Sequence, residues 1–139
     1  MTFVLDASVY IATLSPSERH HEAARALLAL RPASMTFLVP AVFRLEVLAA
    51  LTRRGAPTEL IDTVDALIRG PGFYHVSVDA ELLDEACTLA RHSGLRAYDA
   101  LYATLALTRA ATLLTLDRDV VDRLKVSHPE LEVRDQPRL

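Results

Sequence analysis

Residues 2–6, TFVLD, place an aspartate directly after a short run of apolar, β-forming residues. Similar runs recur along the chain and are separated by stretches with helical spacing. They are MTFLVP from Met35, FYHVSV from Phe73, ATLLTL from Ala111 and a weaker LEVR from Leu131. Strands that alternate with helices, and that are apolar throughout, indicate a parallel sheet covered by helices on both faces. The sequence therefore predicts an α/β fold.

Caps and apolar stripes predict the helices between these strands. Ser15, Pro16 and Glu18 combine a capping box with proline at the first helical position, which predicts a helix to about Leu30. The other predicted helices cover residues 41–54, an apolar stripe over 60–68, a segment capped by Asp79 and ended by Gly94, about 98–108, and a short stretch after Asp117.

The chain has 139 residues, of which 51% are hydrophobic and 24% charged, and this suits one compact domain over residues 1–139. No apolar run approaches the roughly 18 residues needed to cross a bilayer. The N-terminus also lacks the features of a secretory signal, so we expect a soluble, cytoplasmic protein. Cys87 is the only cysteine, so no internal disulfide can form. Its place beside Leu83 and Ala90 on a predicted helix indicates a small core residue.

The charge balance leaves nucleic-acid binding open. A net charge of −3 and a pI near 5.9 argue mildly against a nucleic-acid binder, which usually has a basic surface. However, Lys125 is the only lysine, so the basic residues are almost all arginine. The planar guanidinium of arginine binds phosphate in two-pronged geometry, which the ammonium of lysine cannot do.

Four acids are placed where the predicted sheet would gather them. Asp6 directly follows the first strand, and Asp117 follows the fourth in LLTLDRD. Glu46 lies six residues beyond the second strand, in the helix that returns from the same edge, and Asp99 begins the helix that leads to the fourth strand. Ligands of such sheets bind at the carboxyl ends of the strands. Asp6, Asp99 and Asp117 can each also be explained as a helix N-cap.

Glu46 is harder to explain as a structural residue. In VFRLEVLAAL its neighbours three and four residues away are Val42, Phe43, Ala49 and Ala50, so its own helix offers no basic partner. A carboxylate on an apolar face needs a partner from elsewhere, and a divalent cation can supply it. Four carboxylates at one edge fit Mg²⁺ or Mn²⁺. Zinc fits less well, because the five histidines are scattered or adjacent, and we expect none of them to bind metal.

Four segments together resemble the PIN-domain nucleases, in particular the VapC-type toxins of toxin–antitoxin pairs. They are VLDASV, PAVFRLEVLAAL, GLRAYDALYATLAL and LLTLDRDV, in the family's order and over nearly the whole chain. Carried over by position, the family's metal-binding and catalytic acids are Asp6, Glu46, Asp99 and Asp117. Ser8 and Thr115 match the small hydroxyl residues that support the site. Asp119 either shares the role of Asp117 or belongs only to the first turn of the last helix.

The resemblance implies a three-layer sandwich with a central parallel sheet of five strands. It implies a Mg²⁺-dependent endoribonuclease that acts as the toxin of a type II toxin–antitoxin system. A metal-activated water would cleave structured RNA of the translation machinery and leave a 5′-phosphate and a 3′-hydroxyl. We expect Asp6 and Asp99 to be direct ligands. The resemblance also implies homodimers and an antitoxin protein whose C-terminal segment covers the site.

Binding of RNA next to four acids requires positive charge. Arg96 and Arg118 lie close to Asp99 and Asp117 in the sequence, and each can meet phosphate or simply pair with a neighbouring acid. Tyr98 and Tyr102 are candidates for stacking on bases, but both can also be core residues.

Two other functions share parts of this pattern. DASVY is close to the Asp-x-Ser-x-Ser loop of metal-dependent adhesion modules, which bind protein and cleave nothing, although Tyr10 replaces the second serine. A receiver-type signalling domain would need a second acid after Asp6 and a lysine near the fifth strand. Here Ala7 follows Asp6, and Lys125 is misplaced for that role.

Overall fold

Five parallel strands form one sheet, as the apolar runs predicted, and their order is β3-β2-β1-β4-β5. The computed structural model describes residues 2–17, 19–29 and 36–135. The strands are β1 (Phe3–Leu5), β2 (Phe37–Pro40), β3 (Phe73–Val76), β4 (Thr112–Leu114) and β5 (Val133–Arg134). The central strand β1 pairs with β2 on one side and with β4 on the other. All strands therefore end at the same edge of the sheet.

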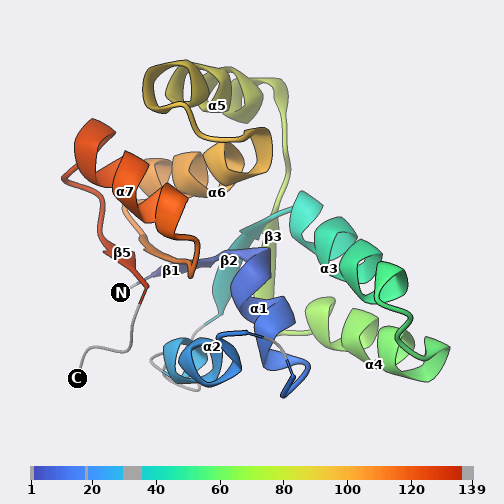
Figure 1. Cartoon of the computed structure of the whole chain (residues 1–139). Helices are drawn as coiled ribbons and strands as arrows, with labels where there is room; N and C mark the ends of the chain where they lie inside the picture. Colours follow the sequence, from blue (N-terminus) through green and yellow to red (C-terminus); the bar gives the residue numbers. More distant parts are fainter. Residues whose placement is uncertain (1, 18, 30–35, 136–139) are drawn as a thin grey trace.

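Seven helices among the described residues cover the two faces of this sheet (Figure 1). They are α1 (Ala7–Thr13), α2 (His21–Leu28), α3 (Val42–Arg53), α4 (Thr58–Ile68), α5 (Ala80–Ser93), α6 (Ala97–Thr108) and α7 (Arg118–Ser127). In Figure 1, α5, α6 and α7 form one group above the sheet, and α1 to α4 lie on the other side. This arrangement follows from right-handed crossovers, because the connections from β1 to β3 and from β3 to β5 run in opposite directions across the sheet.

The middle of the molecule is filled by β1, β4 and α6. Every residue of β1 and of β4 is buried. Residues 100–106 of α6 are buried without a break, and α6 packs against β1, β2 and β4. A helix that is apolar on all sides belongs in the interior, so α6 is the central helix of its layer. Asp99, at its start, is thereby fixed to the core of the protein.

The helix ends bear out several of the predicted caps. Asp79 Oδ1 accepts a hydrogen bond from the Leu82 backbone N–H at 2.9 Å, and Gly94 ends α5 with φ of 75°. Asp6 caps α1 and Asp117 caps α7 in the same way. Glycine adopts the left-handed backbone conformation at little energetic cost, which explains why a glycine occupies position 94.

The segment after β1 differs from its prediction. A short helix, α1, follows Asp6 directly, and the next helix, α2, begins at His21 rather than at Pro16. The Ser15 hydroxyl lies 2.9 Å from that of Ser17 and caps no helix. The chain turns between α1 and α2 through His20, which has φ of 71°. Glu18, Leu30 and Met35, which the predicted boundaries also used, lie outside the described residues.

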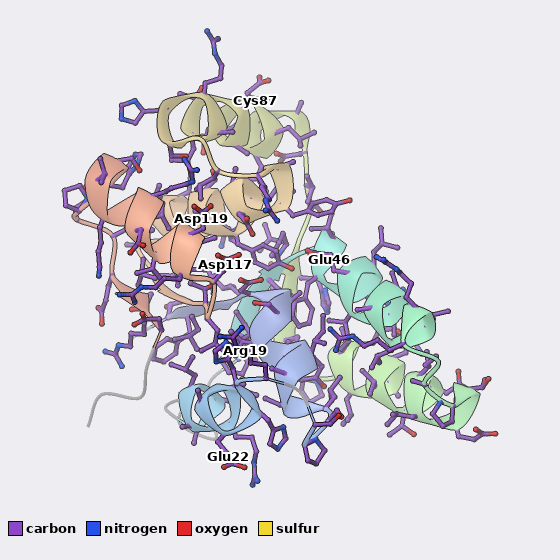
Figure 2. The ribbon with its side chains drawn as sticks, in the orientation of Figure 1. Arg19, Glu22, Glu46, Cys87, Asp117 and Asp119 are labelled. Atoms are coloured by element: carbon purple, nitrogen blue, oxygen red, sulfur yellow. The ribbon has the colours of Figure 1, made fainter. Side chains whose placement is uncertain are left out.

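Cys87 is exposed on α5, so its prediction as a core residue was wrong (Figure 2). Leu83 is also exposed, and the buried face of α5 consists of Leu82, Ala86 and Leu89. The reason is that α5 is an outer helix, packed on α6 and α7 rather than on the sheet. Within the described residues, no helix combines the length and the apolar character that crossing a membrane would require.

Candidate metal centre and nuclease site

All four predicted acids line one cleft of about 550 Å³ at the carboxyl ends of the strands. Asp6 comes from the end of β1, Glu46 from the second turn of α3, Asp99 from the first turn of α6, and Asp117 from the loop after β4. Figure 2 labels Glu46 and Asp117 in the middle of the molecule, near the starts of α3 and α7. Segments that are far apart in the sequence thus bring carboxylates to one place, as the parallel sheet requires.

Asp6 is the most enclosed of these acids, with 8% of its surface exposed. Its Oδ2 accepts a hydrogen bond from the Thr115 hydroxyl at 2.7 Å, and its Oδ1 accepts one from the Ser8 backbone N–H at 3.2 Å. Burial raises the pKa of Asp6, the hydrogen bonds from Thr115 and Ser8 oppose the rise, and the charge of Asp117 adds to it. The Asp6 carboxylate is therefore held in one orientation, and a cation bound beside it would stabilise its ionised form.

The Thr115 hydroxyl joins the two strand-end acids. It donates to Asp6 and accepts a hydrogen bond from the Asp117 backbone N–H at 3.1 Å. Asp117 Oδ1 in turn accepts from the backbone N–H groups of Asp119 and Val120, at 3.0 and 3.3 Å, and so caps α7. Thr115 is completely buried, so this link is protected from water. Capping uses one oxygen of Asp117 and leaves the other for the cleft.

Glu46 has a neutral hydrogen-bond partner rather than a basic one. The Tyr102 hydroxyl, in the core on α6, donates to Glu46 Oε1 at 2.8 Å. Burial raises the pKa of Glu46 to about 7, and the charges of Asp6 and Asp99 contribute to the rise, while the Tyr102 hydrogen bond opposes it. Tyr102 is thus a core residue that orients Glu46, and no local pattern in the sequence indicates this contact between two separate helices.

Asp99 has a similar environment. Burial raises its pKa to about 6, and the negative charges of Asp6 and Asp117 add to the rise. The positive charge of Arg96 opposes it. The raised pKa values of three of the four acids have the same causes, namely burial and like charge. Such a cluster of perturbed carboxyls in a cleft is typical of a functional site.

Asp119 and Arg118, which lie close to Asp117 in the sequence, both form ion pairs. The Asp119 carboxylate, exposed on α7, receives the Arg123 guanidinium at 2.9 Å and is absent from the residues that line the cleft. Arg118 pairs with Asp135 at 2.6 Å rather than with Asp117, the acid that it follows in the sequence. Arg53 lines the cleft instead. It lies seven residues after Glu46 on α3, and that helical spacing was a usable sign that the two share a face.

The donor set of the cleft fits a hard cation. Its acidic lining offers only carboxylate oxygens, with the Ser8 hydroxyl beside them. Among the described residues, no group of three or more Asp, Glu, His or Cys side chains is placed to hold a metal ion by itself. Mg²⁺ does not require one, because it usually keeps several waters and binds through one or two carboxylates. The carboxylate oxygens of this lining therefore fit Mg²⁺ or Mn²⁺ better than they fit zinc.

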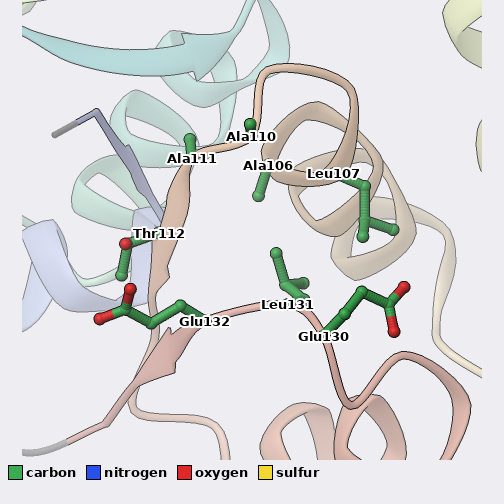
Figure 3. Close-up of a pocket in the computed structure, with 8 residues that line it drawn as sticks. All are labelled: Ala106, Leu107, Ala110, Ala111, Thr112, Glu130, Leu131 and Glu132. Carbon is green, nitrogen blue, oxygen red and sulfur yellow. The ribbon is translucent and has the colours of Figure 1, made fainter.

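A second hollow, of about 340 Å³, lies at the opposite edge of the sheet (Figure 3). It is lined by the residues just before β4 and β5, including Ala110, Ala111 and Glu132. Glu132 is paired with Arg134 at 2.8 Å. The amino ends of parallel strands are not where α/β proteins bind their ligands, so this hollow is not the candidate site.

A family model described as the PIN domain matches residues 3–126. The chain belongs to the PIN domain family. This membership replaces the adhesion-module and receiver-domain alternatives. A search of curated protein sequences finds no match.

Solved structures show the same fold in toxin–antitoxin proteins. The VapC20 toxin of Mycobacterium tuberculosis, described as cleaving the sarcin–ricin loop, is 21% identical with a TM-score of 0.73, and the match covers 87% of this chain and 94% of that one. A toxin–antitoxin complex from Klebsiella pneumoniae is 17% identical with a TM-score of 0.70, covering 99% and 98%. VapBC2 of Rickettsia felis, bound to a promoter DNA fragment, is 16% identical with a TM-score of 0.70, covering 96% and 98%. This PIN-domain chain therefore has the three-layer fold of VapC toxins.

Proposed function

We propose that this PIN-domain protein is a metal-dependent endoribonuclease that acts as a VapC-type toxin. The observation that carries the proposal is the convergence of Asp6, Glu46, Asp99 and Asp117 on one cleft. Burial first, and then the charges of neighbouring acids, raise the pKa values of Asp6, Glu46 and Asp99, so keeping these groups ionised is a cost to the folded protein. Negative charge gathered in this way, with little compensation from within the cleft, supports a divalent cation as its partner.

Asp6 and Asp99 would hold the metal directly, and Glu46 and Asp117 would hold it directly or through water. Bound Mg²⁺ or Mn²⁺ would activate a water for in-line attack on a phosphodiester and neutralise charge on the phosphoryl oxygens. Hydrolysis of this kind leaves a 5′-phosphate and a 3′-hydroxyl.

The protein side chains supply orientation and proton transfer. Thr115 fixes Asp6 relative to Asp117 across the β1–β4 pair, and Tyr102 fixes one oxygen of Glu46. A carboxylate that lines the cleft and is held by a neutral hydroxyl rather than by a basic side chain, such as Glu46, can take a proton from a water beside it. Glu46 is therefore our choice for the group that helps to deprotonate the nucleophile.

The substrate and partners of the proposed toxin follow from its likeness to VapC proteins. VapC20 is described as cleaving the sarcin–ricin loop, and the Klebsiella protein is found in a toxin–antitoxin complex. By analogy, we propose a structured RNA of the translation machinery as the substrate, an antitoxin protein as the inhibitor, and a homodimer of single-domain chains as the toxin.

A cleavage assay tests the proposal. Purified protein is incubated with total cellular RNA and Mg²⁺ or Mn²⁺, and the new RNA ends are sequenced. We expect cleavage at few positions, 5′-phosphate ends, and complete inhibition by EDTA. Asp6→Asn should be inactive, whereas Asp62→Asn, the same change at an exposed position of α4, should cleave normally. Cleavage that persists in EDTA, or in Asp6→Asn protein of equal purity, would contradict the metal mechanism.

A further inference from the structure

A third hollow, of about 250 Å³, lies among α5, α6 and α7, the three helices that form one group in Figure 1. Leu89 of α5 is buried and Leu107 of α6 is half-buried, so the hollow has an apolar base. His92 of α5, Thr104 of α6 and His128, the C-cap of α7, also line it, and we call it the Thr104 hollow. None of its described lining residues also lines the acid cleft, so the hollow is separate from the candidate metal centre.

The Thr104 hydroxyl lacks a hydrogen-bond partner. The residue is 3% exposed, and its hydroxyl oxygen bonds to no other described residue. A threonine inside a helix can donate to the carbonyl three or four residues earlier. Five other helical threonines of this chain do so, namely Thr13, Thr52, Thr63, Thr88 and Thr108. A buried hydroxyl without a partner is unfavourable, so a ligand that bonds to Thr104 would remove a cost of folding.

Two imidazole rings stand at right angles in the lining of the hollow. The rings of His92 and His128 have centroids 5.9 Å apart and an interplanar angle of 83°. Nδ1 of His128 also lies 3.0 Å from the Ser127 hydroxyl, a contact that fixes this ring. Aromatic rings attract one another in offset-stacked or edge-to-face contacts, with centroids about 4.5–7 Å apart. A third ring can therefore stack on one imidazole and meet the edge of the other.

The size of the hollow limits what it can hold. An apolar cavity of about 150 Å³ can bind one benzene molecule. A hollow of about 250 Å³ therefore has room for one aromatic ring with a small substituent. A transition metal is a poorer occupant, because among the described residues no third acid, imidazole or thiol joins the two histidines to complete a metal site.

We propose that the Thr104 hollow is a binding site for a small hydroxylated aromatic compound, of which phenol is the simplest example. The ring would lie on Leu89 and Leu107 and against the two imidazoles, and its hydroxyl would donate to Thr104 Oγ1. Threonine has two accessible rotamers in a helix, so the Thr104 hydroxyl can turn toward the ligand. The ligand then supplies the partner that the folded chain lacks. This inference does not rest on the proposed nuclease function.

The test compares three ligands of similar size. Phenol has an aromatic ring and a hydroxyl, toluene has the ring alone, and cyclohexanol has a hydroxyl on a ring that is not aromatic. Each is titrated into the full-length protein in EDTA, so that no metal occupies the acid cleft. Calorimetry gives the affinities, and amide shifts of the ¹⁵N-labelled protein locate the site.

Two variants and two matched controls are titrated in the same way. Thr104→Val keeps the shape of the side chain and removes the hydroxyl, and His92→Ala removes one of the two imidazoles. Thr112→Val is the control for the first variant, because Thr112 is also buried, at 4% exposed, but lies on β4 and does not line this hollow. Arg91→Ala is the control for the second, because Arg91 is the exposed neighbour of His92 and does not line the hollow.

We expect the parent to bind phenol at millimolar concentration or below, and about fivefold more tightly than toluene or cyclohexanol. Thr104→Val should weaken phenol binding to the level of toluene and leave toluene binding unchanged. It should not lower the melting temperature of the free protein, because the hydroxyl that it removes is unpaired. His92→Ala should weaken phenol and toluene alike, the two controls should change neither affinity, and the amide shifts should centre on Leu89 and Thr104.

Several results would overturn the proposal. They are absence of phenol binding at millimolar concentration, equal affinity of the parent for phenol and toluene, phenol binding that Thr104→Val leaves unchanged, and amide shifts centred outside the hollow. A Thr104→Val protein that unfolds or melts well below the parent would show that the hydroxyl has a partner within the chain, and this too would refute the reasoning. All these measurements are independent of RNA cleavage, so an inactive parent protein would count against the nuclease proposal alone.

Discussion

Replacing Glu46 by glutamine isolates the electrostatic cost of the acid cluster. Glutamine has nearly the same shape and keeps an oxygen that can accept the 2.8 Å hydrogen bond from Tyr102. The substitution therefore removes one negative charge and little else. In the metal-free protein this should relieve the repulsion from Asp6 and Asp99 and the cost of burying the Glu46 charge.

The size and pH dependence of the effect follow from the pKa of Glu46. Its rise from 4.5 to about 7 corresponds to about 3 kcal/mol when the group is fully ionised. Glu46 is only half-buried and solvent screens its charge, so about 1–2 kcal/mol is a realistic expectation. The folded protein retains this proton between pH 4.5 and about 7, where the unfolded chain has lost it. The free energy of unfolding of the parent therefore falls as the pH rises through this range.

Urea denaturation in EDTA at pH 5 and pH 8 measures this directly. We expect Glu46→Gln to be about 1–2 kcal/mol more stable than the parent at pH 8, with a smaller difference at pH 5. Excess Mg²⁺ should stabilise the parent more than the variant, because the variant has lost a ligand or a charge near the metal. Glu85→Gln, on the exposed side of α5, is the matched control and should show neither effect.

The opposite sign would refute the reasoning. If Glu46 were one half of a buried ion pair, Glu46→Gln would destabilise the protein by about 3–5 kcal/mol at pH 8. A stabilisation that is the same at both pH values would also exclude relief of an ionised, crowded carboxylate. Either result, combined with full nuclease activity, would remove Glu46 from the proposed metal centre.

Other perturbations of the site have equally definite expected outcomes. Thr115→Val should lower the free energy of unfolding by about 1–3 kcal/mol and reduce cleavage, because it removes the hydroxyl between Asp6 and Asp117. Thr115→Ser keeps a hydroxyl and should retain both stability and activity, as measured by urea denaturation and cleavage rates. The cleavage rate at limiting Mg²⁺ should rise between about pH 5.5 and 8, because Glu46 and Asp99 must lose protons to bind metal. Raising the Mg²⁺ concentration should shift the midpoint of this rise to lower pH, and a midpoint that does not depend on Mg²⁺ would contradict the reasoning. Expression of the protein should arrest growth, and Asp6→Asn should relieve the arrest at equal protein level; equal toxicity of the two proteins would show that Asp6 is not catalytic.

The placement of the acids was predictable from the sequence because it depends on chain direction alone. Once the apolar runs indicate parallel strands, Asp6 and Asp117 must lie at the same edge, whatever the side chains around them do. Glu46 was predictable for a different reason, since its own helix offers no basic residue three or four positions away.

The contacts that tune these acids were not predictable from the sequence. Tyr102 reaches Glu46 across 56 residues, and no local pattern records which hydroxyl of α6 meets which carboxylate of α3. The sequence was also insufficient to predict which face of α5 is buried. Apolar residues occur on more than one side of this helix, so spacing alone cannot decide whether Leu83 and Cys87 or the stripe of Leu82, Ala86 and Leu89 faces the core. Packing on α6 and α7 decides it.

The hydrogen bond between Asp6 and Thr115 has a consequence for synthesis of the protein. The two residues are separated by 109 positions in the chain. During synthesis, β1 cannot pair with β4, and their acids cannot meet, until the ribosome has made β4. At ribosomal rates of about 5–20 residues per second, that wait lasts roughly 5–20 seconds. Until then the nascent chain carries its first acid without the last one. The cleft with its four acids therefore cannot be complete in the nascent chain before Asp117 has been synthesised.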